Sequence, residues 1–238
     1  MATIADNLQA VRDRITRAAR AAGREAEKIT LLAVSKTHPA QRVLEAVGAG
    51  QRAFGENYVQ EAVLKMDAIA AASDPRVALE WHLIGPLQSN KTRTVAERFD
   101  WVQTIDREKI AERLSAQRAE TRAPLNVLVQ VNVSGEASKS GVAPESALAL
   151  ARAIARLPRL RLRGLMAIPE PTDDAALQRS RFRLLRELLE AAREGGLALD
   201  TLSMGMSDDM EAAIAEGATM VRIGTAIFGA RESARSIA

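Results

Sequence analysis

Ile-Thr-Leu-Leu-Ala-Val-Ser-Lys, residues 29–36, is the stretch that decides the fold of this chain. Five of its first six residues are apolar and three are β-branched. Such an unbroken run predicts a strand that is buried on both faces, as in a parallel sheet. Pro39 cannot continue the strand and fits the start of a following helix. The stretch therefore predicts a lysine, Lys36, at the C-terminal end of a buried strand.

Lys36 belongs to a small group, because the chain has six lysines beside 27 arginines. A lysine amine can lose its proton when it is partly desolvated and can then attack a carbonyl, whereas arginine stays protonated. The alternative is a lysine whose head simply reaches water at the strand end. The strand alone does not decide between a nucleophile and a solvated lysine.

Composition narrows the class of protein. A chain of 238 residues with 47% hydrophobic content can bury the core of a single α/β barrel. The absence of cysteine excludes disulfides, thiolate metal sites and cysteine nucleophiles, and two histidines are too few for a histidine-based metal site.

Charge and hydropathy bear on partners and location. The net charge is only +3 and seven residues are aromatic, which gives no support to a nucleic-acid surface. The N-terminus lacks a signal-peptide pattern, and no apolar run approaches the length of a membrane span. We therefore expect a soluble, cytoplasmic monomer with no nucleic-acid or membrane partner.

Strand and helix patterns alternate along the whole chain. The expected strands are 29–34, 53–57, 80–85, 101–105, 126–133, 162–168, 201–205 and 220–223. The expected helices are 42–47, 58–72, 89–98, 107–119, 144–157, 175–194, 207–216 and a short one from 225, after an amphipathic helix within residues 1–23. Eight such units predict one α/β domain over residues 1–238, a single (β/α)8 TIM-type barrel over 29–228 with an extra N-terminal helix. A doubly wound open sheet is the alternative fold.

Three local features carry further expectations. Asp106 is placed to cap the helix that follows it, and Ser207 is interpreted as a helix N-cap with Asp208 and Asp209 in the first turn. The polar loop 134–141 does not have the residue order of a P-loop. We hypothesise that this loop gates the mouth of the barrel.

The C-terminal strand ends of such a barrel would gather polar side chains and glycines at one mouth. The residues concerned are Lys36, Asn57, His82, Met166, Ser203, Gly205, Arg222, Gly224 and Thr225. Small residues after the last two strands would let backbone N–H groups approach a phosphate, although tight turns would also explain the glycines. Arg222 would point inward and need a partner, for which an inward acid is the structural alternative.

Most of the other positions also have structural alternatives. His82 would be a satisfied core histidine, Met166 would only fill the core, and Tyr58 would staple the helix that it begins. Together, however, a lysine nucleophile, a phosphate cradle and an inward arginine fit pyridoxal 5'-phosphate, with the lysine as a Schiff base and the arginine at the ring nitrogen. A phosphosugar aldolase is the rival that the residues leave open.

Several motifs resemble those of the pyridoxal phosphate homeostasis proteins, the YggS/PROSC family. They are Leu-Leu-Ala-Val-Ser-Lys (31–36), Phe-Gly-Glu-Asn-Tyr (54–58), Trp-His-Leu-Ile-Gly (81–85), Gln-Ser-Asn-Lys (88–91), Gly-Leu-Met (164–166), Leu-Ser-Met-Gly-Met-Ser-Asp-Asp (202–209) and Val-Arg-Ile-Gly-Thr-Ala-Ile-Phe-Gly (221–229). The likeness covers nearly the whole chain and implies a barrel similar to the N-terminal domain of alanine racemase (fold type III of the pyridoxal phosphate proteins).

The resemblance also implies roles for the residues at the mouth. Lys36 would carry the cofactor as a Schiff base and Arg222 would lie near the pyridine nitrogen. The phosphate would be surrounded by Ser203, Gly205, Gly224 and Thr225, and the pocket would be lined by Asn57, His82 and Met166.

The same resemblance implies a carrier or buffer of the cofactor in vitamin B6 homeostasis, without catalytic turnover, that serves pyridoxal-phosphate-dependent apo-enzymes transiently. An amino-acid racemase-like enzyme is the alternative. It would need an acid or base on the second face of the cofactor. In alanine racemase this acid or base is a tyrosine that comes from an additional domain. In the present chain, His82 and Tyr58 would have to take its place.

Overall fold

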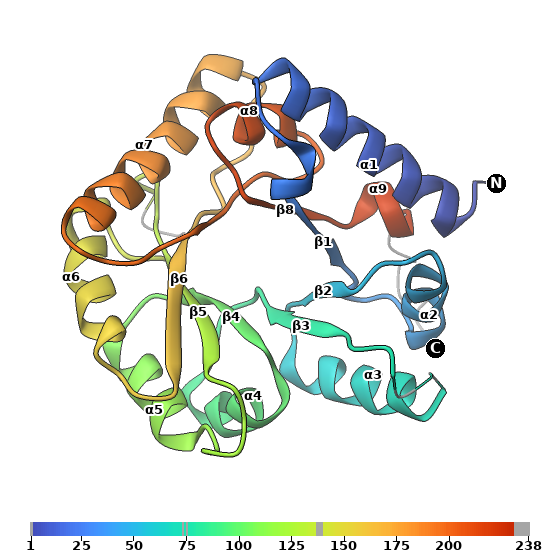
Figure 1. Cartoon of the computed structure of the whole chain (residues 1–238), viewed down its shortest axis with the longest axis horizontal. Coiled ribbons are helices and arrows are strands. Elements are labelled where there is room, and N and C mark those ends of the chain that lie inside the picture. The colour runs from blue at the N-terminus through green and yellow to red at the C-terminus, as the bar shows by residue number, and fades with distance from the viewer. Residues whose placement is uncertain (1, 73, 75, 137–139, 231–238) are drawn as a thin grey trace, which may run out of the picture.

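Eight parallel strands close into one barrel in which each strand pairs with the next and β8 returns to pair with β1 (Figure 1). The computed structural model describes residues 2–72, 74, 76–136 and 140–230. The strands are β1 Thr30–Val34, β2 Ala53–Glu56, β3 Glu80–Leu83, β4 Trp101–Ile105, β5 Leu125–Gln130, β6 Leu160–Met166, β7 Thr201–Ser203 and β8 Met220–Ile223. The expected (β/α)8 barrel is confirmed, and the open sheet is excluded.

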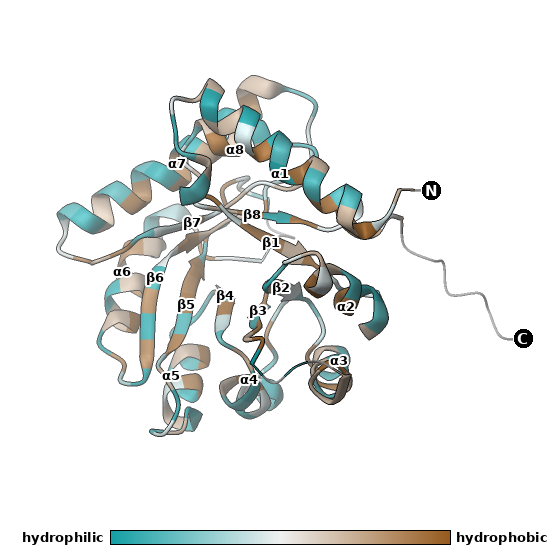
Figure 2. Cartoon of the chain, turned by 45° about the vertical axis from the view of Figure 1, so that its right-hand side comes forward, coloured by the Kyte–Doolittle hydropathy of each residue, from teal (hydrophilic) through white to brown (hydrophobic). Residues whose placement is uncertain are grey.

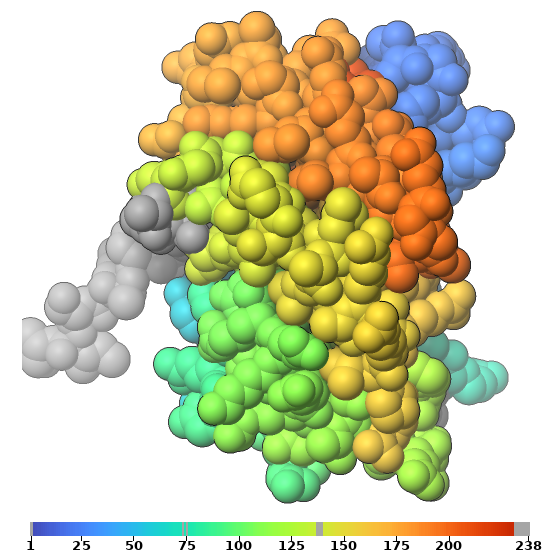
Figure 3. Space-filling view, turned by 90° about the vertical axis from the view of Figure 1, so that its left-hand side faces the viewer, coloured from blue at the N-terminus to red at the C-terminus, as the bar shows by residue number. Residues whose placement is uncertain are grey.

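Helices surround the barrel and follow the strands. They are α1 Ile4–Ala21, α2 Ala40–Gly48, α3 Val59–Ala72, α4 Thr92–Arg98, α5 Glu108–Gln117, α6 Pro144–Ala155, α7 Ala175–Glu194, α8 Met210–Ala215 and α9 Thr225–Phe228. Teal and brown residues alternate along helices such as α1 and α7 (Figure 2), and the residues of their apolar stripes are buried. In the space-filling view, α6 and α7 form a continuous outer wall (Figure 3). This arrangement buries the apolar stripe of each helix against the sheet.

The extra N-terminal helix α1 closes the barrel on the side of the last strand. Its buried stripe contains Ile4, Leu8, Val11 and Ile15, as the sequence predicts. The helix packs against α8 and α9, and Asn7 Nδ2 donates to the carbonyl oxygen of Ile227 at 2.9 Å. The first and last parts of the described chain therefore hold each other in place.

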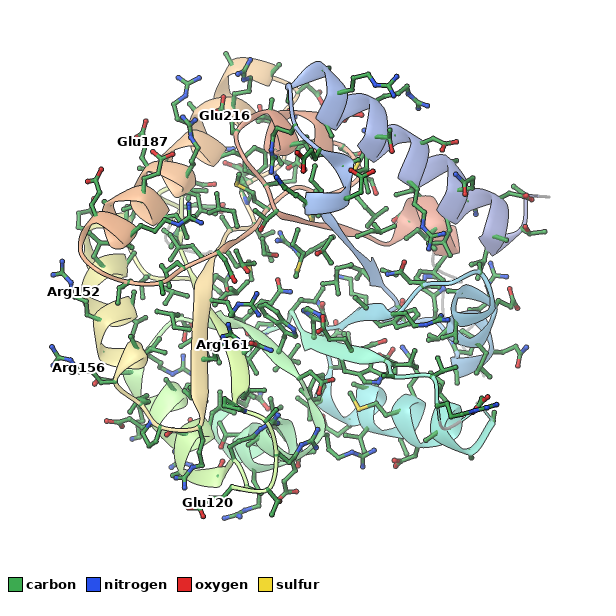
Figure 4. The ribbon with its side chains drawn as sticks, in the orientation of Figure 1. Glu120, Arg152, Arg156, Arg161, Glu187 and Glu216 are labelled. Carbon is green, nitrogen blue, oxygen red and sulfur yellow. The ribbon has the colours of Figure 1, made fainter. Side chains whose placement is uncertain are left out.

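One surface cluster shows how the arginine-rich exterior is organised. Glu216, at the end of α8, has a buried carboxylate that contacts three arginines of α7, and Figure 4 places it beside that helix. Arg179 Nε lies 2.9 Å, Arg183 Nη2 3.2 Å and Arg186 Nη2 3.6 Å from the carboxylate. Arg152 on α6 and Arg156 just after this helix, by contrast, point away from the barrel (Figure 4).

The start of α5 differs from the expectation. The helix begins at Glu108, with Arg107 in the N-cap position and no side-chain cap. Asp106 therefore lies one residue too early to cap the helix. Its carboxylate instead pairs with Arg107 at 3.1 Å.

The start of α8 also differs from the expectation. The helix begins at Met210, so Ser207 is not its N-cap and Asp208 lies outside its first turn. Asp209 occupies the N-cap position but does not cap the helix, because its carboxylate accepts the backbone N–H of Met206 at 2.6 Å. The loop after β7 is thus held by an aspartate that the sequence assigned to the helix.

The loop 134–141 is described only in part, and residues 137–139, on which the gating hypothesis falls, lie outside the described residues. Its base is fixed, because Val142 N–H donates to Gln130 O at 2.9 Å and Asn132 N–H donates to Val142 O at 2.8 Å. Among the described residues, no helix is both long and apolar enough to cross a bilayer.

Candidate ligand site at the barrel mouth

Lys36 lies one residue beyond the buried Ser35, just after the end of β1, and is itself half-buried. Strand β1 lies between β2 and β8, with Leu32 opposite Arg222 across the seam that closes the barrel. Because all eight strands are parallel, their C-terminal ends meet at one mouth. Lys36 therefore shares this mouth with the ends of β2 and β8, where Asn57 and Gly224 follow.

A buried group of charges supports the strand end from outside the barrel. We call Ser35, Glu56, Glu61 and Lys65 the outer ion cluster. Lys65 Nζ lies 2.6 Å from Glu56 Oε1 and 3.1 Å from Glu61 Oε1, and donates to the backbone oxygen of Ser35 at 2.8 Å. Ser35 Oγ donates to Glu56 Oε1 at 2.6 Å. The ammonium thus ties α3 to the end of β1.

The outer ion cluster holds the residues on both sides of Lys36. Ser35 is fixed by Lys65 and Glu56, and the backbone N–H of Thr37 donates to Glu61 Oε1 at 2.6 Å. Thr37 has φ of 66°, a left-handed conformation that is costly for a β-branched residue. The contacts to both neighbours fix the backbone from which the Lys36 side chain starts.

Glu56 is the member of the cluster whose hydrogen bonding is least satisfied. Its carboxylate is completely buried, and Oε2 has no hydrogen-bond partner among the described residues. Burial raises the pKa of this carboxyl, while Lys65 and Ser35 oppose the rise. The position is stable only because the ammonium of Lys65 lies against the other oxygen.

A second polar network runs through the barrel interior. We call Glu80, His82, Gln103, Ser203 and Arg222 the inner relay. His82 Nε2 lies 2.7 Å from Glu80 Oε1, and its Nδ1 lies 2.9 Å from Gln103 Nε2. Ser203 Oγ donates to Gln103 Oε1 at 2.6 Å and accepts from Arg222 Nη1 at 2.8 Å. The relay therefore joins strands β3, β4, β7 and β8 across the core.

Arg222 is the end of the relay nearest the mouth. Its second terminal nitrogen, Nη2, donates to the backbone oxygen of Ala167 at 2.8 Å. Burial lowers the pKa of Arg222 to about 10, against the opposing charge of Asp209, so the guanidinium is a cation at neutral pH. Its partners are a hydroxyl and a carbonyl, which is not the inward acid that the sequence offered as the structural alternative.

The backbone after β7 and β8 leaves little room for side chains. Gly205 has φ of +94°, and a Cβ there would lie 2.6 Å from the Cβ of Ala213. A Cβ on Gly224 would lie 3.0 Å from the backbone oxygen of Val34. Gly224 precedes α9, which no described side chain caps, and Thr225 is exposed at its first position. Backbone N–H groups in this part of the mouth are not covered by side chains, and such groups can approach an anion.

The predicted site residues fall into two layers. Lys36, Asn57, Gly224 and Thr225 are partly or fully exposed at the C-terminal ends of their strands. His82, Met166, Ser203, Gly205 and Arg222 are buried. Both ring nitrogens of His82 are engaged, as the core alternative expected, and Met166 packs with Trp101 and Leu128.

Six residues of the two networks were not singled out as site residues from the sequence, namely Ser35, Glu56, Glu61, Lys65, Glu80 and Gln103. Gln103 and Glu80 lie at inward positions of β4 and β3, and Glu56 and Lys65 lie behind the Lys36 strand. Their signals are polar residues within otherwise apolar strands and one rare lysine on the apolar stripe of a helix. Among the described residues, no group of histidine and carboxylate side chains is arranged to hold a metal ion.

Comparison with known proteins places the chain, as a whole, in a family. The family model described as "Alanine racemase, N-terminal domain" matches residues 7–232. The chain is 61% identical over 232 residues to the pyridoxal phosphate homeostasis protein of Pseudomonas aeruginosa, covering 98% of this chain and 97% of that protein. It is 58% identical over 238 residues to the protein of the same name from Escherichia coli K12, covering 98% of each.

A solved structure gives the same result for the fold. The barrel superimposes on PipY of Synechococcus elongatus, solved with pyridoxal 5'-phosphate (PLP) bound, with a TM-score of 0.82 and 36% sequence identity. The match covers 95% of this chain and 100% of that one.

Proposed function

We infer the function of this chain from its family, because the chain belongs to the pyridoxal phosphate homeostasis proteins, which carry the alanine racemase N-terminal domain. The chain binds pyridoxal 5'-phosphate at the barrel mouth and holds it as a Schiff base on Lys36. It acts in intracellular vitamin B6 homeostasis in the cytoplasm, as a monomer and without catalytic turnover. Pyridoxal-phosphate-dependent apo-enzymes are its transient partners.

The observation that carries this proposal is that Lys36 follows the end of β1 while Arg222 lies on the adjacent strand β8, opposite Leu32, so that both belong to one mouth. The cofactor supplies an aldehyde for an amine, a ring nitrogen for a polar group and a phosphate for backbone donors. Lys36 offers the amine, and Arg222 offers a buried cation near the ring. The bare backbone at Gly205, Gly224 and Thr225 offers the N–H groups.

The buried side chains contribute from below the ligand rather than by touching its phosphate. Ser203 has no exposed surface, and its hydroxyl is already engaged with Gln103 and Arg222. We therefore propose that Ser203 and His82 serve the site through Arg222. Met166 packs beneath the pocket, and Asn57 lines its rim.

The same geometry favours a carrier over a racemase. A cation at the ring nitrogen disfavours protonation of that nitrogen, which makes the cofactor a weaker electron sink. Proton transfer on the second face needs an additional acid or base. His82 is completely buried with both nitrogens engaged, and Tyr58 is 57% exposed just before α3. The engagement of both His82 nitrogens argues against that residue in the role and supports the carrier.

The test is an absorption spectrum of the protein with pyridoxal 5'-phosphate, followed by borohydride reduction and peptide mapping. We expect a Schiff-base band and a single adduct on Lys36, both lost in Lys36→Ala and retained in a control, Lys109→Ala, which changes an exposed lysine of α5. An adduct scattered over several lysines would reject the site. Incubation with amino acids in deuterated water then tests turnover, since rapid exchange at Cα would reject the carrier and favour the racemase.

A further inference from the structure

Arg222 poses a problem of charge. Its side chain is buried inside the barrel, and among the described residues it forms no ion pair with a carboxylate. An unpaired buried cation is expensive, so it needs a compensating negative charge or strongly oriented dipoles. Asp209 is one negative charge that acts on the guanidinium, although it forms no ion pair with it. The hydrogen bonds of the inner relay supply oriented dipoles, and they lead to a second carboxylate, that of Glu80.

The relay has one consistent direction of donation, which begins at the arginine. Arg222 N–H can only donate, so Ser203 Oγ accepts from it and gives its own proton to Gln103 Oε1. The amide nitrogen of Gln103 then faces His82 Nδ1. Since an amide N–H is a donor, Nδ1 must accept, and the imidazole proton lies on Nε2, facing the carboxylate of Glu80.

The orientation of the Gln103 amide is fixed by its other neighbours. In the reverse orientation, both Gln103 and Arg222 would donate to Ser203 Oγ, and the serine proton would have no acceptor within the relay. Gln103 Nε2 also lies 3.1 Å from Met220 Sδ, which accepts and does not donate. Both contacts select the orientation in which every link points from Arg222 toward Glu80.

We propose that Glu80 is a second, remote counter-charge of Arg222 beside Asp209, joined to it through His82, Gln103 and Ser203. In this proposal the relay positions the guanidinium that faces the ligand. Glu80 begins β3, so it lies at the opposite end of the barrel from the mouth, in a depression that Asp100 and Asn126 also line. It is a positioning residue, since it acts on the ligand only through Arg222. This inference rests on the proposed function for its effect on pyridoxal 5'-phosphate, but the relay itself is a property of the unliganded chain.

The relay tolerates only the neutral form of His82. A second proton on Nδ1 would face the amide N–H of Gln103 and break the chain at its centre. The charged groups around the ring are Glu80 on its own strand, Asp100 before β4 and, beside Glu80, Arg163 of β6. Burial lowers the pKa of His82, against the raising effect of Glu80 and Asp100, which keeps the ring neutral near neutral pH.

Nuclear magnetic resonance of the imidazole nitrogens tests the relay in the unliganded protein. The chain has only two histidines, so a His38→Gln variant assigns the signals. We expect His82 to carry its proton on Nε2 at neutral pH. We also expect Gln103→Glu, which replaces the amide donor by an acceptor, to make His82 doubly protonated. A wild-type ring protonated on Nδ1, or an unchanged ring in Gln103→Glu, would overturn the proposal.

Binding of pyridoxal 5'-phosphate tests the effect at the other end of the barrel. We expect Glu80→Gln, which keeps the hydrogen bond to His82 but removes the charge, to raise the dissociation constant about threefold. The matched control is Glu120→Gln, because Glu120 lies in the loop before β5, at the same end of the barrel, and pairs with Arg159 at 3.4 Å, outside the relay. Equal effects of the two variants would overturn the role of Glu80.

Failure of the function and failure of the relay give different results. If wild-type protein does not bind pyridoxal 5'-phosphate, the proposed function fails, while the resonance experiment still decides the relay. If the cofactor binds normally and His82 has the other tautomer, only the relay is rejected.

Discussion

The outer ion cluster and the inner relay lie on opposite sides of the Lys36 strand and hold the mouth in different ways. The outer cluster uses full charges, with Lys65 within 3.1 Å of two carboxylates, and acts on the backbone around Lys36. The inner relay places three neutral residues, His82, Gln103 and Ser203, between its two charged ends, and it acts on the side chain of Arg222.

The difference lies in what a single broken link leaves behind. Removing the ammonium from the outer cluster leaves Glu56 as a buried, unpaired charge, which is among the most expensive defects in a folded protein. Removing one of the neutral side chains of the relay leaves unsatisfied hydrogen-bonding groups, which cost less free energy of folding than a buried, unpaired charge. We therefore expect the outer cluster to govern stability and the inner relay to govern the properties of the ligand.

The largest expected effect is that of Lys65→Met. Loss of the cation should lower the free energy of unfolding by about 3–5 kcal/mol, measured by urea denaturation. The control is Lys28→Met, which removes an exposed lysine paired with Glu25 at 2.7 Å and should change stability by no more than about 0.5 kcal/mol. Equal effects of the two variants would show that Glu56 does not depend on Lys65. The double variant with Glu56→Gln should recover part of the loss.

Ser203→Ala measures the corresponding break in the inner relay. Arg222 loses an acceptor and Gln103 loses a donor, so we expect a loss of about 1–3 kcal/mol in the same assay. Ser180→Ala is the control, because that serine is exposed on α7 and its hydroxyl donates to Leu177 O at 2.9 Å, away from both networks. A loss larger than that of Lys65→Met would reverse the ranking of the two networks.

The smallest expected effect is a change in how stability depends on pH in Glu56→Gln. The folded-state pKa of Glu56 is raised above its ordinary value of 4.5 by burial, so its contribution is fully present below about pH 4.5 and is lost as the pH rises through the folded pKa. The variant lacks this loss. Its unfolding free energy should therefore gain on wild type as the pH rises from 4.5 toward neutrality, by about 1.4 kcal/mol for each unit by which the pKa is raised.

Glu211→Gln is the matched control of opposite sign. The hydrogen bond from Arg14 lowers the pKa of Glu211, so its contribution is present above the unfolded pKa and is lost as the pH falls. Relative to wild type, this variant should weaken as the pH rises. Parallel curves for the two variants would contradict the assigned shifts.

The strand order could be predicted from the sequence because each buried strand is a short apolar run bounded by turn residues. Strand ends were less predictable. The fifth strand was expected to reach Val133 but ends at Gln130, because the backbone N–H of Asn132 bonds to Val142 O instead of to a neighbouring strand. The seventh ends at Ser203, because Gly205 turns the chain with a positive φ.

The two networks could not be predicted in the same way. Ser203 and Gln103 are 100 residues apart and meet only after the barrel closes, so no local pattern joins them. Lys65 does have a local signal, because it lies between Ala62 and Ile69 on the buried stripe of α3, where a lysine needs a partner. The roles of the individual residues toward a cofactor remain predictions.

The β1–β8 seam also has a consequence for the timing of synthesis. Thr30 pairs with Met220, so the contacts that close the barrel join parts of the chain about 190 residues apart. On a ribosome, the chain emerges from its N-terminus at a limited rate, and such distant contacts form late. Lys36 is made early, but Arg222 and Gly224 arrive near the end. An unfinished chain therefore has no complete mouth, and the ligand binding proposed for this mouth would be acquired only with β8.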